Sequence, residues 1–117
     1  MQNRDNIENE DELLHWQSRL ERIKEYVLAN LAADLSTGTV AGKFGLNEAT
    51  LRHLFQRQQH ESYHDYVERR RMTKALQLLS EGKWVKEVIR AVGYKNKSTF
   101  NDAFKKRYRY PASYFKK

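Results

Sequence analysis

Residues Ser62 to Gly82 read SYHDYVERRRMTKALQLLSEG, and the other helices of the chain are expected to be organised around this segment. Ser62 can cap the start of a helix, with Asp65 three residues later as an acidic capping-box partner, and Gly82 is a typical C-terminal stop. The stretch therefore predicts one helix of about five turns. Its apolar face changes direction by roughly a third to half a turn along the helix. The early apolar side chains are Tyr63, Tyr66 and Val67, and the later ones are Met72, Ala75, Leu76 and Leu79.

A helix of this kind can pack each half against a different group of helices, and burial in a single core is the alternative. The flanking sequence favours the first of these arrangements, because it contains one pattern twice, once on each side of the helix. The first copy is VAGKFG at 40–45, Asn47 and TLRHLFQR at 50–57, and the second is VIRAVG at 88–93, Asn96 and TFNDAFKK at 99–106. The glycines lie 48 positions apart and the phenylalanines of the long segments 49, so the second turn holds one extra residue. Each copy predicts a short helix, a glycine turn and a longer capped helix, which is the sequence form of a helix-turn-helix.

The whole chain is expected to be all-α, with about seven helices and no alternating strand pattern of useful length. Residues 1–12 are acidic, carry almost no apolar side chains and are expected to be a disordered tail. The predicted organisation is then a first helix-turn-helix lobe over 13–61, a linker helix over 62–81 and a second helix-turn-helix lobe over 82–117. Within the lobes, helices are expected over about 13–30, 37–44 and 84–92, after the caps Asn47 and Asn96, and in a last turn after Pro111.

The amino-acid composition indicates the class of binding partner and the cellular compartment of the protein. The 117 residues contain no cysteine, which excludes disulfides and thiolate metal sites and fits a reducing compartment. The net charge of +7 is uneven, because residues 1–12 carry one base and five acids, whereas residues 60–117 carry fifteen bases and six acids. A basic body favours a polyanionic partner, although a lysine-rich surface often serves only solvation. No signal peptide and no membrane span are recognisable, so a cytoplasmic location is expected.

About residues 22–116 resemble the DNA-binding domain of AraC/XylS-type bacterial transcription regulators. The matching positions are Ala41, Gly45, Leu51, Leu54, Phe55, Tyr66, Arg71, Ala75, Leu79, Val85, Lys86, Glu87, Val88, Gly93, Tyr94, Phe100, Phe104, Lys105 and Lys106. The resemblance implies two helix-turn-helix lobes joined by a long helix, which bind adjacent major-groove segments of double-stranded DNA to regulate transcription. Because one chain carries both repeat units, binding to DNA as a monomer is expected, at the nucleoid. The resemblance favours activation, with RNA polymerase as a further partner.

Several positions depart from the pattern of this family. Ile89 stands where a small alanine is usual, and its bulk at the helix crossing is expected to shift the helices of the second lobe. His60 and Arg109 stand where glycine is common. Pro111-Ala112 and Lys116 only approximate the usual proline and arginine near the end.

The outer face of the first long helix has the chemistry to recognise bases. Arg52 can donate two hydrogen bonds to O6 and N7 of guanine, and Ala49 can contact the methyl group of thymine. His53 can donate to a base or a phosphate, although a lone surface histidine usually does nothing specific. These three side chains point outward if Leu51 and the Leu54-Phe55 pair point inward.

The second long helix offers a different set of groups. Asn101 suits the N6 and N7 edge of adenine, and Lys97 suits guanine or a phosphate. Asp102 can accept from N4 of cytosine, or it can orient a neighbouring lysine by pairing one turn away. The resemblance places its base-contacting positions on Ala49, Arg52, His53, Lys97, Ser98 and Asp102. Side chains better suited to phosphate contacts are Lys43, Gln56, Lys86, Arg90, Lys105 and Lys106, and simple solvation is the alternative for each lysine.

His60-Glu61-Ser62-Tyr63-His64 matches H-E-x-x-H, the signature of zinc metalloproteases. That chemistry needs both histidines on one continuous helix face. Because Ser62 is expected to cap the linker helix, His60 falls in the preceding turn, and neither a metal nor any other cofactor is expected.

Three classes of function each match some feature of this sequence. They are a sequence-specific DNA-binding regulator without enzymatic activity, a helical protein-interaction module that has lost base recognition, and a small zinc hydrolase acting through His60, Glu61 and His64. The basic, amide-bearing outer faces favour the first over the second, because a protein-binding groove would present exposed apolar anchors there.

Overall fold

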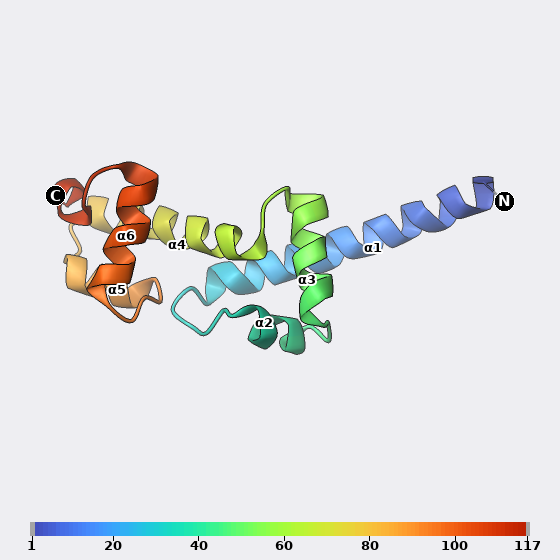
Figure 1. Cartoon of the computed structure of the whole chain (residues 1–117), viewed down its shortest axis with the longest axis horizontal. Coiled ribbons are helices and arrows are strands. Elements are labelled where there is room, and N and C mark those ends of the chain that lie inside the picture. The colour runs from blue at the N-terminus through green and yellow to red at the C-terminus, as the bar shows by residue number, and fades with distance from the viewer. Residues whose placement is uncertain (1, 117) are drawn as a thin grey trace. The chain divides into compact units, whose positions relative to one another are not determined.

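The computed structural model describes residues 2–116, and that range is entirely helical apart from its turns and connections (Figure 1). The all-α class is therefore confirmed. The elements are α1 (Gln2–Ala29), α2 (Thr37–Lys43), α3 (Glu48–Leu54), a π-helix η1 (Phe55–Gln59), α4 (Tyr63–Ser80), α5 (Val85–Ala91), α6 (Lys97–Tyr108) and a 3-10 helix η2 (Ala112–Phe115). Among the described residues, no helix combines the length and the apolar character that crossing a membrane would require.

The chain divides into two compact units, each with one copy of the repeat. The first unit contains the chain up to Ala29 together with Ser36–Tyr63, and the second contains Asn30–Leu35 together with the chain from His64 onward. The pair α2 and α3 thus belongs to the first unit, and the pair α5 and α6 to the second. Apart from its first residue, α4 is counted with the second unit, so the linker helix is also a core element of one lobe.

The core of the first unit forms where three helices bring their apolar stripes together. Its buried side chains are Leu20, Ile23 and Val27 of α1, Val40 and Ala41 of α2, Leu51 and Leu54 of α3, and Phe55 and Tyr63 after them. The rings of Phe55 and Tyr63 meet edge to face with centroids 5.1 Å apart, a favoured aromatic geometry. At the rim, Arg19 donates a hydrogen bond to the carbonyl oxygen of Phe44.

The first helix begins earlier than the sequence analysis expects. It starts at Gln2 instead of Leu13, so residues 2–12 continue α1 and are not a disordered tail. Once Leu20, Ile23 and Val27 fix the helix against the core, each further residue adds a hydrogen bond without a new nucleation step.

The core of the second unit is built on the later apolar side chains of α4. Its buried members are Met72, Ala75, Leu79, Val88, Val92, Phe100, Ala103, Phe104 and Ala112. Phe104 is central, because its ring lies 4.8 Å from the ring of Tyr108 and 5.7 Å from those of Phe100 and Phe115, centroid to centroid. The 3-10 helix η2 thus closes one side of this core.

Arg71 ties the segment Asn30–Leu35 into the second unit. Its Nε donates to the carbonyl oxygen of Leu31 at 3.1 Å and its Nη2 to that of Ala33 at 3.0 Å. Gly93 is required beside this contact, because a Cβ atom on it would lie 2.3 Å from the Leu31 carbonyl oxygen. The guanidinium of Arg71 also lies 5.8 Å from the ring centroid of Tyr94. Burial, and to a smaller extent the charge of Glu68, raise the pKa of the Tyr94 hydroxyl above 10.0.

The helix ends agree with the sequence signals. The side chain of Asn47 accepts from the amide of Thr50 at 2.8 Å, and that of Asn96 accepts from the amide of Thr99 at the same distance. These bonds satisfy amides that the first turn of a helix leaves unpaired. Gly82 has φ of +88° and ends α4, where left-handed backbone is easiest for glycine. The turns of the two helix-turn-helix motifs contain glycines with φ of +68° and +88°.

His60 and Arg109 occupy the same left-handed conformation without being glycine. Their φ values are +59° and +72°, and they follow the last residues of η1 and α6. His60 and Arg109, which replace the glycines common in the family, therefore lie at two positions where the backbone conformation favours glycine.

We expect His60→Gly and Arg109→Gly each to raise the free energy of unfolding by about 0.5–1 kcal/mol. Left-handed backbone costs other residues roughly 1–2 kcal/mol, and the greater freedom of glycine in the unfolded chain offsets roughly 0.4–1 kcal/mol of the gain. Urea unfolding followed by circular dichroism measures the change. The controls His60→Ala and Arg109→Ala keep the strained backbone, and equal stabilisation by alanine would contradict this explanation.

Candidate nucleic-acid interface

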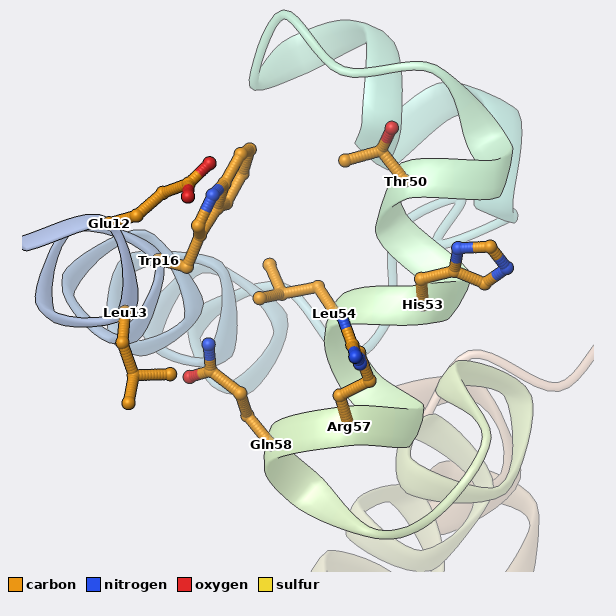
Figure 2. A pocket seen from close by; sticks show the side chains of 8 residues that line it. All are labelled: Glu12, Leu13, Trp16, Thr50, His53, Leu54, Arg57 and Gln58. Atoms are coloured by element: carbon orange, nitrogen blue, oxygen red, sulfur yellow. The ribbon is translucent and has the colours of Figure 1, made fainter. Parts of the chain in front are cut away.

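The helix α3 has one face in the core and one in solvent. Leu51 and Leu54 are buried, whereas Ala49, Arg52 and His53 are exposed. Figure 2 shows Leu54 pointing toward Trp16 of α1, while His53 projects away from α1. The inward and outward faces predicted for this helix are therefore observed. The first helix-turn-helix motif presents a methyl group, a guanidinium and an imidazole together.

Arg52 has a neighbour that the sequence analysis did not single out. Its Nη1 lies 3.5 Å from Oε1 of Glu48, one helical turn earlier, and both side chains are 57% exposed. Glu48 is the first residue of α3, directly after the cap Asn47. The carboxylate thus belongs to the N-terminal end of α3, and the guanidinium of Arg52 follows one turn later on the same helix.

A π-helix follows α3 in place of further α-helical turns. It covers Phe55–Gln59, keeps Phe55 buried and leaves Gln56 exposed. Because a π-helix takes more residues per turn, the direction of Gln56 differs from the one that 100° spacing predicts. Exposed Arg57, which the sequence analysis did not assign, lies one position further on. The side-chain oxygen of Gln58 is buried and has no hydrogen-bond partner among the described residues.

A cavity of about 590 Å³ separates α1 from α3 and the π-helix (Figure 2). Its lining residues are Glu12, Leu13, Trp16, Thr50, His53, Leu54, Arg57 and Gln58. Leu13 remains 51% exposed beside it. Arg52 does not line the cavity, so the cavity and the guanidinium belong to different sides of α3.

The helix α6 repeats the division into two faces in the second unit. Phe100, Ala103 and Phe104 are buried, and the outward side chains are polar or charged. The exposed members are Lys97, Ser98, Thr99, Asp102, Lys105, Lys106 and Arg107. Asn101 is half-buried, so it lies at the margin of the outward face and not at its centre.

Four cationic side chains line a groove of about 620 Å³ between α5 and the start of α6. Lys86, Arg90 and Lys97 were predicted to contact DNA, and Lys95 joins them here. Its other lining residues are Val85, Ile89, Tyr94 and Asn96, so no acid faces it. Lys95 belongs to the turn with one extra residue, which is the sequence signal that could have identified it. The groove therefore concentrates positive potential on one side of the second motif.

The two motifs differ at the helix crossing. Ala41 of α2 is 1% exposed, whereas Ile89 at the corresponding position of α5 is half-buried at the edge of the second core. The pair α2 and α3 packs more extensively than α5 and α6. Ile89 thus lies at the edge of the core, and the expected shift of the second lobe's helices stays a prediction.

The remaining phosphate candidate is Lys43, near the end of α2. Its side chain is exposed, and its Nζ lies 5.1 Å from the centroid of the Tyr26 ring. A cation over an aromatic face is attracted to the ring, which limits where the lysine can point.

The H-E-x-x-H residues do not share a continuous helix. His60 has a left-handed backbone after the π-helix, whereas His64 lies in the first turn of α4, which begins at Tyr63. His64 Nδ1 is 3.7 Å from Oδ1 of Asp65. Across the described residues, no group of three or more histidine, aspartate and glutamate side chains is arranged to hold a metal ion.

Comparison with known proteins supports a helix-turn-helix assignment. A family model described as a helix-turn-helix domain matches residues 40–117. Among solved structures, the C-terminal domain of the two-component response regulator yesN from Fusobacterium nucleatum superposes with a TM-score of 0.80 at 22% identity, covering 86% of this chain and 99% of its own. A search of curated protein sequences found no match.

Two further structures show the same fold at similar identity. The C-terminal domain of AraT, a response regulator from Geobacillus stearothermophilus, superposes with a TM-score of 0.78 at 24% identity, covering 81% of this chain and 80% of its own. A transcriptional regulator of the AraC-type DNA-binding-domain class from Chromobacterium violaceum gives 0.76 at 22% identity, with 85% and 89% covered. At these identities the likeness concerns the fold.

We expect the purified protein to retain no stoichiometric zinc after dialysis, because His60 precedes α4 with a left-handed backbone whereas His64 lies within α4, so the two do not share one helix face. Metal analysis by mass spectrometry tests this expectation. One zinc ion per chain that survives dialysis and is lost in His64→Ala would contradict it.

Proposed function

The chain belongs to the family of AraC-type helix-turn-helix DNA-binding domains, and on that premise we propose that it regulates transcription by binding specific sequences of double-stranded DNA. The family and the fold are those of transcription-regulator DNA-binding domains and not of enzymes. The observation that carries the proposal is that each unit holds a capped helix whose inner face is core and whose outer face is polar. Such a helix is what the major groove of B-DNA accommodates.

The first motif is proposed to supply most of the base specificity. Arg52 on α3 is exposed and carries the side chain best suited to guanine, with hydrogen bonds to O6 and N7. Ala49 and His53 flank it on the same helix and would contact a thymine methyl group and a further base or phosphate. Lys43 and Gln56 would contact DNA phosphates on either side of these bases.

The second motif is proposed to supply more of the salt-dependent affinity. The groove of Lys86, Arg90, Lys95 and Lys97 carries four positive charges and faces no acid. Neutralising phosphates with such side chains releases counterions, which strengthens binding to any sequence. Lys105 and Lys106 add charge in the last turn of α6. Ser98, Asn101 and Asp102 would provide the base contacts of this motif.

A monomer carries both motifs, so we propose that one copy binds two adjacent major-groove segments. A palindromic site is then unnecessary, because the two recognition helices have different outer faces. Activation with RNA polymerase as a partner, and action in the cytoplasm at the nucleoid, follow from the family and complete the proposal. A site selected from a random DNA pool would provide the ligand for its tests.

Arg52→Ala is expected to weaken binding to the selected site by roughly 1–3 kcal/mol and to relax specificity at one base pair. Lys106→Ala should instead weaken all sequences about equally and reduce the slope of log affinity against log salt by about one. Fluorescence anisotropy on the selected site and on random duplex, at several salt concentrations, measures both effects. Equal losses on specific and random DNA for Arg52→Ala would remove it from the base-contacting set.

Hydroxyl-radical footprinting of the monomer on the selected site should reveal two protected segments centred about 10 base pairs apart, one helical turn of DNA. Arg52→Ala should change sequence preference in one segment only. A single protected segment, or a symmetric pattern that forms only with a dimer, would contradict binding by both motifs of one copy.

A further inference from the structure

Glu48 is the acid closest to the guanidinium proposed to recognise a base. Its Oε1 lies 3.5 Å from Arg52 Nη1, and both residues belong to the outer side of α3. An exposed pair one helical turn apart contributes little to stability, because water screens the attraction. The fold therefore does not need this pair, and its main effect is on where the Arg52 side chain points.

The other oxygen of the same carboxylate lies against α2. A Cβ atom built on Gly38 would be 3.4 Å from Glu48 Oε2 and 3.6 Å from its Cδ. One oxygen is thus directed at Arg52 while the other lies beside the backbone of α2. A Cβ atom there would make only an ordinary van der Waals contact, so the carboxylate lies close to the α2 backbone without requiring glycine at this position. The carboxylate of Glu48 thus lies near both the Arg52 guanidinium and the backbone of α2.

An arginine on a DNA-facing helix has two competing ways to bind. It can donate two hydrogen bonds to guanine, which depends on direction, or it can pair with any nearby phosphate, which does not. A carboxylate beside it favours one orientation of the guanidinium and repels phosphates that would compete for it.

We propose that Glu48 is a positioning residue that holds Arg52 for contact with guanine and disfavours its contact with phosphate. The inference rests on the proposed DNA-binding function. Without the carboxylate, Arg52 would bind phosphates more freely, so random DNA would bind more tightly and the selected site would lose its advantage. Glu48 lowers total affinity and raises specificity in this scheme.

Glu48→Gln tests the proposal because it removes the charge and keeps the size of the side chain. The matched control is Glu21→Gln, which removes an exposed acid of the same unit that is paired with Lys24 at 3.2 Å. Affinity is measured on the selected site, on random duplex and on a site with the guanine pair of Arg52 exchanged. Glu48→Gln should reduce the ratio of specific to random affinity about three- to tenfold, a fraction of one bidentate base contact. Glu21→Gln should change it less than about twofold.

A double-mutant cycle separates positioning from direct contact with DNA. In an Arg52→Ala background, Glu48→Gln should leave base preference unchanged, because nothing remains to be positioned. A further change in base preference there would mean that Glu48 contacts a base itself, and it would overturn the proposal. Equal ratios for Glu48→Gln and wild type would also overturn it. The urea midpoint of each variant verifies that the fold is intact.

The two levels of inference fail in different ways. If the wild-type protein shows no preference among duplexes, the proposed function fails and the role of Glu48 fails with it. If the wild type discriminates and Arg52→Ala relaxes the discrimination while Glu48→Gln behaves like Glu21→Gln, only the role of Glu48 is wrong.

Discussion

Helices of seven residues cannot persist alone in water, and α2, α3 and α5 are all of this length. Each depends on burying a few apolar side chains against a longer neighbour. In the first unit the neighbour is α1, with Leu20, Ile23 and Val27, and in the second it is α4, with Met72, Ala75 and Leu79. This dependence determines which face of each short helix is inside. The face left outside is then determined as well, which is how a packing constraint prepares a surface for DNA.

The two units satisfy this constraint with different side chains, and the differences bear on function. A small Ala41 allows α2 to pack closely on α3, and the exposed Arg52 is carried by this well-packed pair. The bulkier Ile89 and the longer second turn accompany a cationic groove instead. Directional hydrogen bonds to bases need a firmly held helix, whereas contacts with phosphates tolerate variation in distance. These differences are the basis of the proposed division between base recognition in the first motif and salt-dependent affinity in the second.

Charge is organised at short range as well as along the chain. The carboxylate of Glu48 accompanies Arg52, the arginine proposed to contact guanine, while the residues that line the groove of the second motif include no acid. A DNA-binding surface made only of cations would bind every sequence strongly. Acids placed beside selected cations can lower that background affinity for random DNA.

The sequence alone determined the features that depend on neighbouring residues. The caps Asn47 and Asn96, the stop at Gly82 and the inward and outward faces of α3 and α6 all follow from local hydrogen bonds, backbone preference and helical period. The start of α1 at Gln2 was not predicted from the sequence, because composition alone does not show how a helix held in a packed core extends beyond it. Only the tertiary structure showed the binding of residues 30–35 by Arg71, the groove between α5 and the start of α6, and the closeness of Glu48 to Gly38. Each of these depends on packing or contacts between segments that are separated in sequence, and no local pattern specifies such contacts.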